Sequence, residues 1–354
     1  MRNVLLKILE KYPLLYNILL IIKYRHDDDF MQIIKGLRSN SSLVELRENP
    51  EAPEELEKKE MWCDISINGA DTGFFAMVRW TLDALYFCEC FGLRPYIRFS
   101  GECLYKDADM PPDRNVYNYY FEQPFSANED SLKNAKSVVV YDSRNRRKAE
   151  MLNGDVIYQT TEEYMDQIAK IMKKYLKFNA ETQAIISEQI HKRGVHEDVL
   201  GVHIRGTDYK SNYKNHPQYI SPQIYYIYID QAIQEYVFKK IYIATDDKEI
   251  LQEFLSRYGS EMVLFSKDTI RSEGNQGIHT IENVERPYHK YRLGIEVICD
   301  MCSLAACGGL VSSLSQVSLM SRIYKKSKNE SFRYDKRINN GINKRGKLFK
   351  ANSN

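Results

Sequence analysis

The stretch LGVHIRGTDYK (residues 200–210) joins a run of apolar residues to a charged end. Its first half is typical of a buried strand, and His203, Arg205 and Asp208 lie at or just after the strand's end. Strand interiors exclude unpaired charge. These side chains therefore indicate either a structural Arg205–Asp208 ion pair or a site that binds a charged ligand, and the stretch alone favours neither.

The sequence on either side of this strand predicts alternating strands and helices. Downstream, a helix starts at Ser221-Pro222, and KKIYIATDD (residues 239–247) predicts a strand followed by a helix capped by Thr245 or Asp246. A strand in EMVLFS, a helix over residues 288–307, the strand GLVSS and a last helix in LSQVSLMSRIYKK complete the series. This alternation predicts a parallel, doubly wound sheet.

Upstream, residues 62–100 predict a strand, a glycine turn, a helix that stops at Gly92 and a second strand, which together form a βαβ unit. Residues 160–192 are largely helical in pattern. We therefore divide the chain into an N-terminal helical or linker segment (1–60), an N-terminal α/β domain (61–190), a C-terminal Rossmann-like domain (191–325) and a basic tail (326–354).

Composition and the two ends of the chain narrow the function classes. A formal net charge of +2 gives no overall indication of nucleic-acid binding. Residues 1–25 form an apolar, cationic segment that predicts a helix lying either in a membrane interface or on the protein itself. The tail, with ten Lys or Arg residues from Lys325 onward, is either a solvated end or attracted to an anionic surface. The seven scattered cysteines fit a reducing compartment.

Polar residues gather where the predicted parallel strands end, which is where such sheets bind ligands. The arginine fork matches phosphate oxygens, and a helix N-terminus with serine and amide side chains adds donors to an anion. Each group also has an ordinary structural role, such as helix capping or ion pairing. The candidate residues at these strand ends are His203, Arg205, Asp208, Asp246, Asp247, Ser313, Ser315 and Gln316.

Two further positions extend this candidate site. Asp300 is a lone carboxylate in an apolar helical pattern, which either accepts hydrogen bonds from a guanine edge or pairs with a basic residue. Gly73 belongs to the glycine turn GADTG, where a backbone can approach a phosphate from the other domain. We find no Asp-x-Asp motif of the sort that holds a divalent metal and no zinc-ligand spacing, so we expect no metal and no other cofactor.

Taken in order, HIRGTDY, NHP, IYIATDDKEIL and VSSLSQ resemble the motif regions of GDP-fucose-dependent fucosyltransferases, closest to the α-1,6 type represented by nodulation Z enzymes and the animal core fucosyltransferase. The resemblance extends from about Trp62 to Tyr324. It implies a GT-B-like architecture of two Rossmann-type domains facing a cleft, and inverting, metal-independent transfer from GDP-fucose.

The resemblance also implies residue roles. Arg205 would bind the β-phosphate and assist its departure, His203 (through its backbone) and Asp300 would read guanine, and Ser315 with Gln316 would hold the diphosphate that Gly73 approaches. The chain departs from the pattern in having Arg205-Gly206 where the α-1,6 enzymes have two arginines, and in lacking a clear match to their general-base glutamate. Asp208, another carboxylate or no side chain takes that role.

The expected function is transfer of L-fucose to a hydroxyl of a glycan. Because the chain lacks the coiled-coil stem and SH3-like module of the animal enzyme, we expect a bacterial surface polysaccharide, glycolipid or oligosaccharide as acceptor. The alternatives are a transferase for another GDP-sugar and a non-catalytic nucleotide-sugar or glycan-binding protein. We expect a cytoplasmic location, with peripheral contact to the inner face of the membrane as an open alternative.

Overall fold

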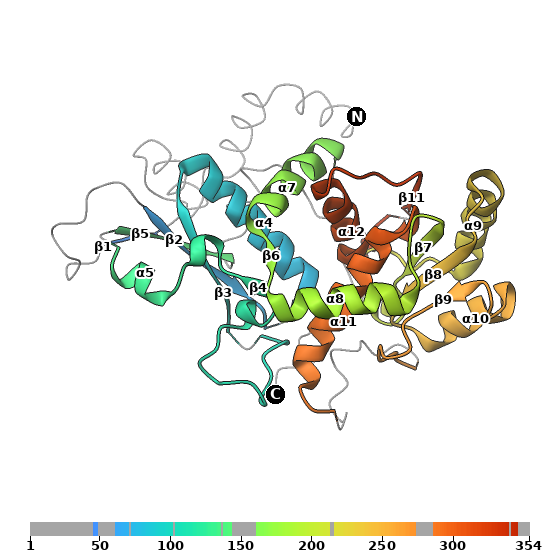
Figure 1. Cartoon of the computed structure of the whole chain (residues 1–354), viewed down its shortest axis with the longest axis horizontal. Helices are drawn as coiled ribbons and strands as arrows, with labels where there is room; N and C mark the ends of the chain where they lie inside the picture. Colours follow the sequence, from blue (N-terminus) through green and yellow to red (C-terminus); the bar gives the residue numbers. More distant parts are fainter. Residues whose placement is uncertain are drawn as a thin grey trace.

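Two β-sheets flanked by helices organise the chain, with a mixed N-terminal sheet on the left of Figure 1 and a parallel C-terminal sheet on the right. In this computed structural model the described residues are 45–48, 61–143 without 71, 102 and 136, 161–273 without 213–215, and 286–345 without 340. The sheet orders are β1-β5-β2-β3 and β11-β10-β7-β8-β9. The expected α/β class with two Rossmann-type sheets is confirmed.

The N-terminal unit contains the predicted βαβ arrangement. Its elements are β1 (Glu45–Glu48), β2 (Trp62–Asn68), α4 (Phe74–Phe91), β3 (Arg94–Ser100), η1 (Val116–Tyr119), β4 (Phe121–Glu122), η2 (Pro124–Ser126), α5 (Glu129–Lys133) and β5 (Ser137–Asp142). β2 pairs in parallel with β3 and β5, and β1 pairs antiparallel with β5. Gly92 ends α4 as predicted, because it adopts a left-handed conformation (φ 65°) in which its N–H bonds back to Cys88.

The C-terminal unit alternates strands and helices after two linking helices. Its elements are α7 (Glu162–Tyr175), β6 (Lys177–Phe178), α8 (Ala180–Arg193), β7 (Val199–Ile204), η4 (Asp208–Ser211), α9 (Pro222–Tyr236), β8 (Lys240–Thr245), α10 (Lys248–Tyr258), β9 (Val263–Leu264), α11 (His289–Ala306), β10 (Gly309–Ser313), α12 (Gln316–Ser327) and β11 (Tyr334–Ile338). Every strand pair in this sheet is parallel. Pro222 opens α9 at the predicted position.

The structure refines one helix prediction and corrects another. The pattern over residues 160–192 is two helices, since the backbone becomes extended at Leu176 and Asn179 caps α8 by accepting a hydrogen bond from the Thr182 amide. The N-cap of α10 is Asp247, which accepts from the amides of Glu249 and Ile250, and not Thr245 or Asp246. The strand β8 continues through Thr245, so the cap falls two residues later.

The segment expected as a basic tail contributes to the fold. Tyr334–Ile338 form β11, which pairs with the edge of β10. Lys325 is almost completely buried and donates to the carbonyls of Ala305 and Cys307 while pairing with Glu197. Part of the positive charge counted from the sequence is therefore structural. The predicted helix at residues 1–25 lies outside the described part of the chain. The same is true of the rest of residues 1–60 apart from β1.

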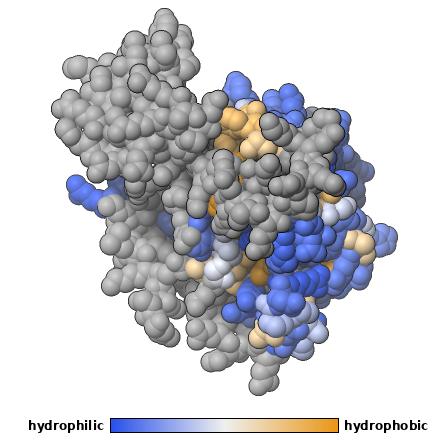
Figure 2. Space-filling model, turned by 90° about the vertical axis from the view of Figure 1, so that its left-hand side faces the viewer, coloured by the Kyte–Doolittle hydropathy of each residue, from blue (hydrophilic) through white to orange (hydrophobic). Residues whose placement is uncertain are grey.

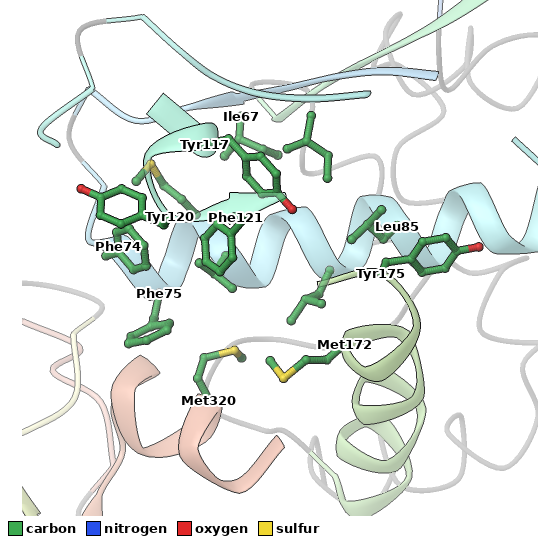
Figure 3. Close-up of a cluster of buried hydrophobic side chains, with 14 of the residues drawn as sticks. Ile67, Phe74, Phe75, Leu85, Tyr117, Tyr120, Phe121, Met172, Tyr175 and Met320 are labelled. Carbon is green, nitrogen blue, oxygen red and sulfur yellow. The ribbon is translucent and has the colours of Figure 1, made fainter. Parts of the chain in front are cut away.

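One hydrophobic core joins helices from both halves of the sequence. Figure 3 shows Met172 of α7 and Met320 of α12 pointing toward each other beside α4, which carries Phe75. Near the start of α11, the Tyr120 hydroxyl donates to the Tyr291 carbonyl at 3.1 Å, and the two rings stack. The helices α11 and α12 thus connect the C-terminal sheet to the core around α4.

On the face shown in Figure 2, hydrophilic residues dominate the described surface, and hydrophobic residues gather in a smaller area. Within the described residues, no helix combines the length and the hydropathy needed to span a membrane.

Gly294→Ala should destabilise the protein, because a Cβ on Gly294 would lie 2.3 Å from the buried Tyr120 hydroxyl. Overpacking of this kind costs about 1–3 kcal/mol, and urea denaturation would measure it as a lower free energy of unfolding. Gly73→Ala is the matched control, since a Cβ there meets no atom within 4 Å. Equal stability of Gly294→Ala and the wild type would contradict this packing.

Candidate active site

The carboxyl ends of β7, β8 and β10 meet at one edge of the C-terminal sheet. These strands are neighbours in the order β10-β7-β8, and their register places Ser312 beside His203 and His203 beside Ala244. The loops that follow the three strands therefore lie next to one another. This edge brings together His203, Arg205, Asp246, Asp247, Ser313, Ser315 and Gln316 from the sequence prediction.

Asp246 fixes the loop that follows β7. Its Oδ2 atom pairs with Arg205 Nη1 at 3.0 Å and accepts from the Thr207 hydroxyl at 2.8 Å, while Oδ1 accepts from the Gly206 amide at 2.9 Å. Asp246 is thus one partner of Arg205, and the Arg205 side chain keeps 28% of its surface exposed. Both oxygens of Asp246 have protein partners, so this residue positions Arg205, and its predicted contact with the donor stays a prediction.

Asp247 has a different role from its neighbour. Its Oδ1 atom caps α10, and its Oδ2 atom pairs with Lys210 at 2.6 Å. A Cβ on Gly206 would lie 2.4 Å from the Asp247 Cβ, so the closeness of this side chain explains why glycine follows Arg205. The predicted donor-binding residues Asp246 and Asp247 are both framework residues in this geometry.

His203 and Ser315 link β7 to the N-terminus of α12. The His203 Nδ1 atom lies 3.2 Å from the Ser315 hydroxyl, which also accepts from the Ser318 amide as the N-cap of α12. Burial, together with the charges of Arg205 and Arg322, lowers the pKa of His203 to about 3. A neutral imidazole next to this helix start leaves Arg205 as the cation that faces an anionic ligand.

The first residues around α12 add polar groups to this edge. The Gln316 Oε1 atom is buried without a hydrogen-bond partner among the described residues. Ser313 is buried, and its carbonyl accepts from the Ser318 hydroxyl at 3.0 Å. The backbone of Asp208 begins η4, whereas its side chain is not among the described groups, so its predicted catalytic role stays a prediction.

The N-terminal unit approaches the same edge through Gly73 and Tyr105. Gly73 is the extended N-cap of α4, and the Phe74 amide donates to the Tyr105 hydroxyl at 2.8 Å. Burial raises the pKa of Tyr105 to about 12, and the positive charge of Arg205 acts in the opposite direction. Arg205 is therefore close enough to influence Tyr105 electrostatically. Tyr105 was missed in the sequence because it lies in an irregular loop without any motif.

Asp300 pairs with a basic residue, which the sequence analysis gave as the structural alternative to hydrogen bonding with a guanine edge. Arg193 Nη1 and the Tyr242 hydroxyl both lie 2.9 Å from Asp300 Oδ1, and Arg193 Nη1 also donates to the Ser303 hydroxyl. Burial and the charge of Asp300 raise the pKa of Tyr242, so its hydroxyl stays protonated and donates. Sequence reasoning missed Arg193 and Tyr242, which lie at a helix end and within an apolar strand.

The described residues contain no group of three or more His, Cys, Asp or Glu side chains placed to hold a metal ion. All seven cysteines are free thiols, and Cys299 and Cys302 are buried in α11, as the apolar pattern around them predicted.

A comparison with known protein families matches part of the chain. Residues 159–321 match the family described as "Alpha-(1,6)-fucosyltransferase N- and catalytic domains". This segment runs from just before α7 into α12 and includes every candidate residue at the β7, β8 and β10 edge. Within this segment the chain is similar to glycosyltransferases of the fucosyltransferase superfamily.

Solved structures of fucosyltransferases are also similar to this chain. NodZ α-1,6-fucosyltransferase soaked with GDP-fucose is 13% identical, with a TM-score of 0.44, over 74% of this chain and 92% of that one. NodZ from Bradyrhizobium is 15% identical, with a TM-score of 0.44, over 73% and 91%. POFUT1 in complex with GDP-fucose is 9% identical, with a TM-score of 0.46, over 81% and 99%. No curated protein matches this chain significantly.

His203→Asn should make the stability of this protein less sensitive to acid. The folded-state pKa of about 3 lies below the unfolded value of about 6.5. The stability linked to neutral His203 is thus fully present above the unfolded pKa and is lost as the pH falls toward the folded pKa. Between about pH 7 and about pH 5 this residue accounts for about 2 kcal/mol of the decrease in unfolding free energy.

Urea denaturation at those two pH values would measure the decrease for the wild type and for the variant. The variant should lose about 2 kcal/mol less than the wild type. The same decrease in both proteins would contradict the neutral, buried state of His203.

Proposed function

We propose that this fucosyltransferase transfers L-fucose from GDP-fucose to a hydroxyl of a glycan acceptor, with inversion and without a metal ion. The observation that carries the proposal is the Arg205 guanidinium, which Asp246 holds at the sheet edge where His203 contacts Ser315, the N-cap of α12. An arginine fork and helix-terminal amides together suit a diphosphate. NodZ and POFUT1, which are similar to this chain, have been solved with GDP-fucose.

In the proposed reaction the acceptor oxygen attacks the anomeric carbon from the face opposite GDP. The bond between that carbon and the β-phosphate oxygen breaks, and negative charge grows on the β-phosphate. Arg205 and the α12 amides would stabilise this charge, which is why no metal ion is required in the proposal. The acceptor's proton passes to a carboxylate, for which Asp208 remains the sequence-based candidate.

The proposed contacts with the rest of the donor follow the same edge of the sheet. The base would lie against the His203 backbone and Asp300, and the diphosphate would lie between Ser315 with Gln316 and the Gly73 backbone. Ser313, buried at the end of β10, would support this loop. The glycan acceptor would approach from the N-terminal unit.

The acceptor and the location are proposed from the sequence. A bacterial surface polysaccharide, glycolipid or oligosaccharide is the proposed acceptor class. The free thiols fit a cytoplasmic location, and residues 1–25 with the basic end of the chain are the proposed peripheral contact with the inner face of the membrane.

Arg205→Ala should lower kcat by roughly 10²–10³-fold, as expected for the loss of one donor aimed at transition-state charge. The measurement is GDP release from GDP-fucose in the presence of acceptor glycans. Arg257→Ala is the matched control, because Arg257 forms an exposed ion pair with Asp230 on the outer helices α9 and α10. A nearly wild-type rate for a folded Arg205→Ala variant would remove Arg205 from the mechanism.

Donor specificity and metal independence can be tested together by calorimetric titration in EDTA. GDP-fucose should bind with the same affinity in EDTA and in Mg²⁺, and UDP-glucose should bind at least about tenfold more weakly. Tighter binding of GDP-mannose than of GDP-fucose would favour the alternative of another GDP-sugar. Loss of GDP-fucose binding in EDTA would contradict the metal-independent mechanism.

A further inference from the structure

A buried network of three side chains lies beside the proposed donor site. It consists of Arg193 at the end of α8, Tyr242 in β8 and Asp300 in α11. The side chains of Arg193 and Asp300 are 3% and 15% exposed, and Tyr242 is fully buried. Asp300 is thus the most accessible member of the three.

The two oxygens of Asp300 have different surroundings. Both contacts, from Arg193 Nη1 and from the Tyr242 hydroxyl, fall on Oδ1. A carboxylate oxygen has two lone pairs, so these two donors use the capacity of Oδ1. Within the described residues no hydrogen bond or ion pair involves Oδ2, and this atom is not among the fully buried polar atoms without a partner. The Asp300 carboxylate is therefore held at Oδ1, and its Oδ2 atom can accept a further hydrogen bond.

The position of this network fits the base of the proposed donor. Tyr242 lies two residues before Ala244, which pairs with His203 at the end of β7. Arg205, which would bind the diphosphate, follows His203 by two residues. The network therefore lies on the α11 side of the sheet. Along the strands, it is close to the position proposed for the diphosphate.

We propose that Arg193 and Tyr242 are positioning residues, which orient Asp300 so that its Oδ2 atom accepts a hydrogen bond from the N–H edge of the donor's guanine base. The inference rests on the proposed function and adds two residues that determine base specificity. An anchored carboxylate has little rotational freedom left to lose on binding, and the buried arginine pairs with it through a charge-assisted contact. Arg271 adds positive charge near Asp300, since the charge of Asp300 acts on the pKa of Arg271.

This arrangement limits how guanine is recognised. A free carboxylate could accept from the guanine N1–H and 2-amino groups with one oxygen each. In this chain only Oδ2 is open, so Oδ2 carries the contact with the base. Adenine offers no donor at positions 1 and 2, so ADP serves as the ligand that keeps the purine, ribose and diphosphate but cannot make this contact.

Two substitutions test the inference. Tyr242→Phe removes only the hydroxyl from a buried ring, and Arg193→Gln removes the charge. By calorimetry, the Kd for GDP should rise about three- to tenfold in Tyr242→Phe and about 10- to 100-fold in Arg193→Gln. The Kd for ADP should change by less than about twofold, because ADP makes no hydrogen bond with Asp300. The preference for GDP over ADP therefore falls in both variants.

The chain supplies a chemically matched control. On the outer helices, Arg257 and Tyr258 contact the two oxygens of Asp230 at 2.6 and 2.8 Å, in an exposed copy of the same residue combination. Arg257→Gln and Tyr258→Phe should leave the affinities for GDP and ADP unchanged. Thermal unfolding of all four variants reports whether each is folded, and Tyr242→Phe carries the test if Arg193→Gln does not fold.

The outcomes separate this inference from the function on which it rests. Tyr242→Phe could weaken the binding of GDP and ADP equally, or weaken neither. In both cases the preference for GDP over ADP is unchanged, and the proposed positioning role is wrong. Fucosyl transfer by the wild type would still stand in that case. If the wild type neither binds GDP nor releases it from GDP-fucose, the proposed function fails together with the inference.

Discussion

The architecture of the candidate site depends on one buried carboxylate. Asp246, at the end of β8, contacts three consecutive residues that follow β7, through the Arg205 guanidinium, the Gly206 amide and the Thr207 hydroxyl. These charge-assisted contacts fix the loop and hold Arg205 at the edge of the sheet where α12 begins. Removing one partner from a buried pair typically costs about 3–5 kcal/mol, so stability and ligand recognition depend on the same contact.

The helices α11 and α12 connect this edge to the other half of the chain. α11 carries Asp300 near the C-terminal sheet, and its first turns pack on Tyr120 of the N-terminal unit, where only glycine fits at position 294. α12 begins at the site with Ser315 and buries Met320 against the core around α4. A substitution in this shared core can therefore alter the geometry of the site without touching it.

The alternating strands and helices could be predicted because their periodicity and stop signals are local, as at Gly92 and Pro222. The strand ends of a parallel sheet also predicted where polar residues would gather. The roles of individual carboxylates could not be predicted, because they depend on partners distant in sequence. Asp246 and Asp247 are adjacent, yet one binds Arg205 and the other caps α10, and Asp300 pairs with Arg193, 107 residues away. β11 was missed because pairing with an existing strand edge gave order to a basic, weakly patterned segment.

The most direct test of the central claim is a crystal structure of the protein with GDP-fucose or GDP bound. We expect the β-phosphate within hydrogen-bond distance of Arg205 and the N-terminal amides of α12, with the guanine edge on Asp300 Oδ2 and the Asp246–Arg205 contact retained. A diphosphate bound elsewhere, or a base that faces away from Asp300, would contradict this account of the site.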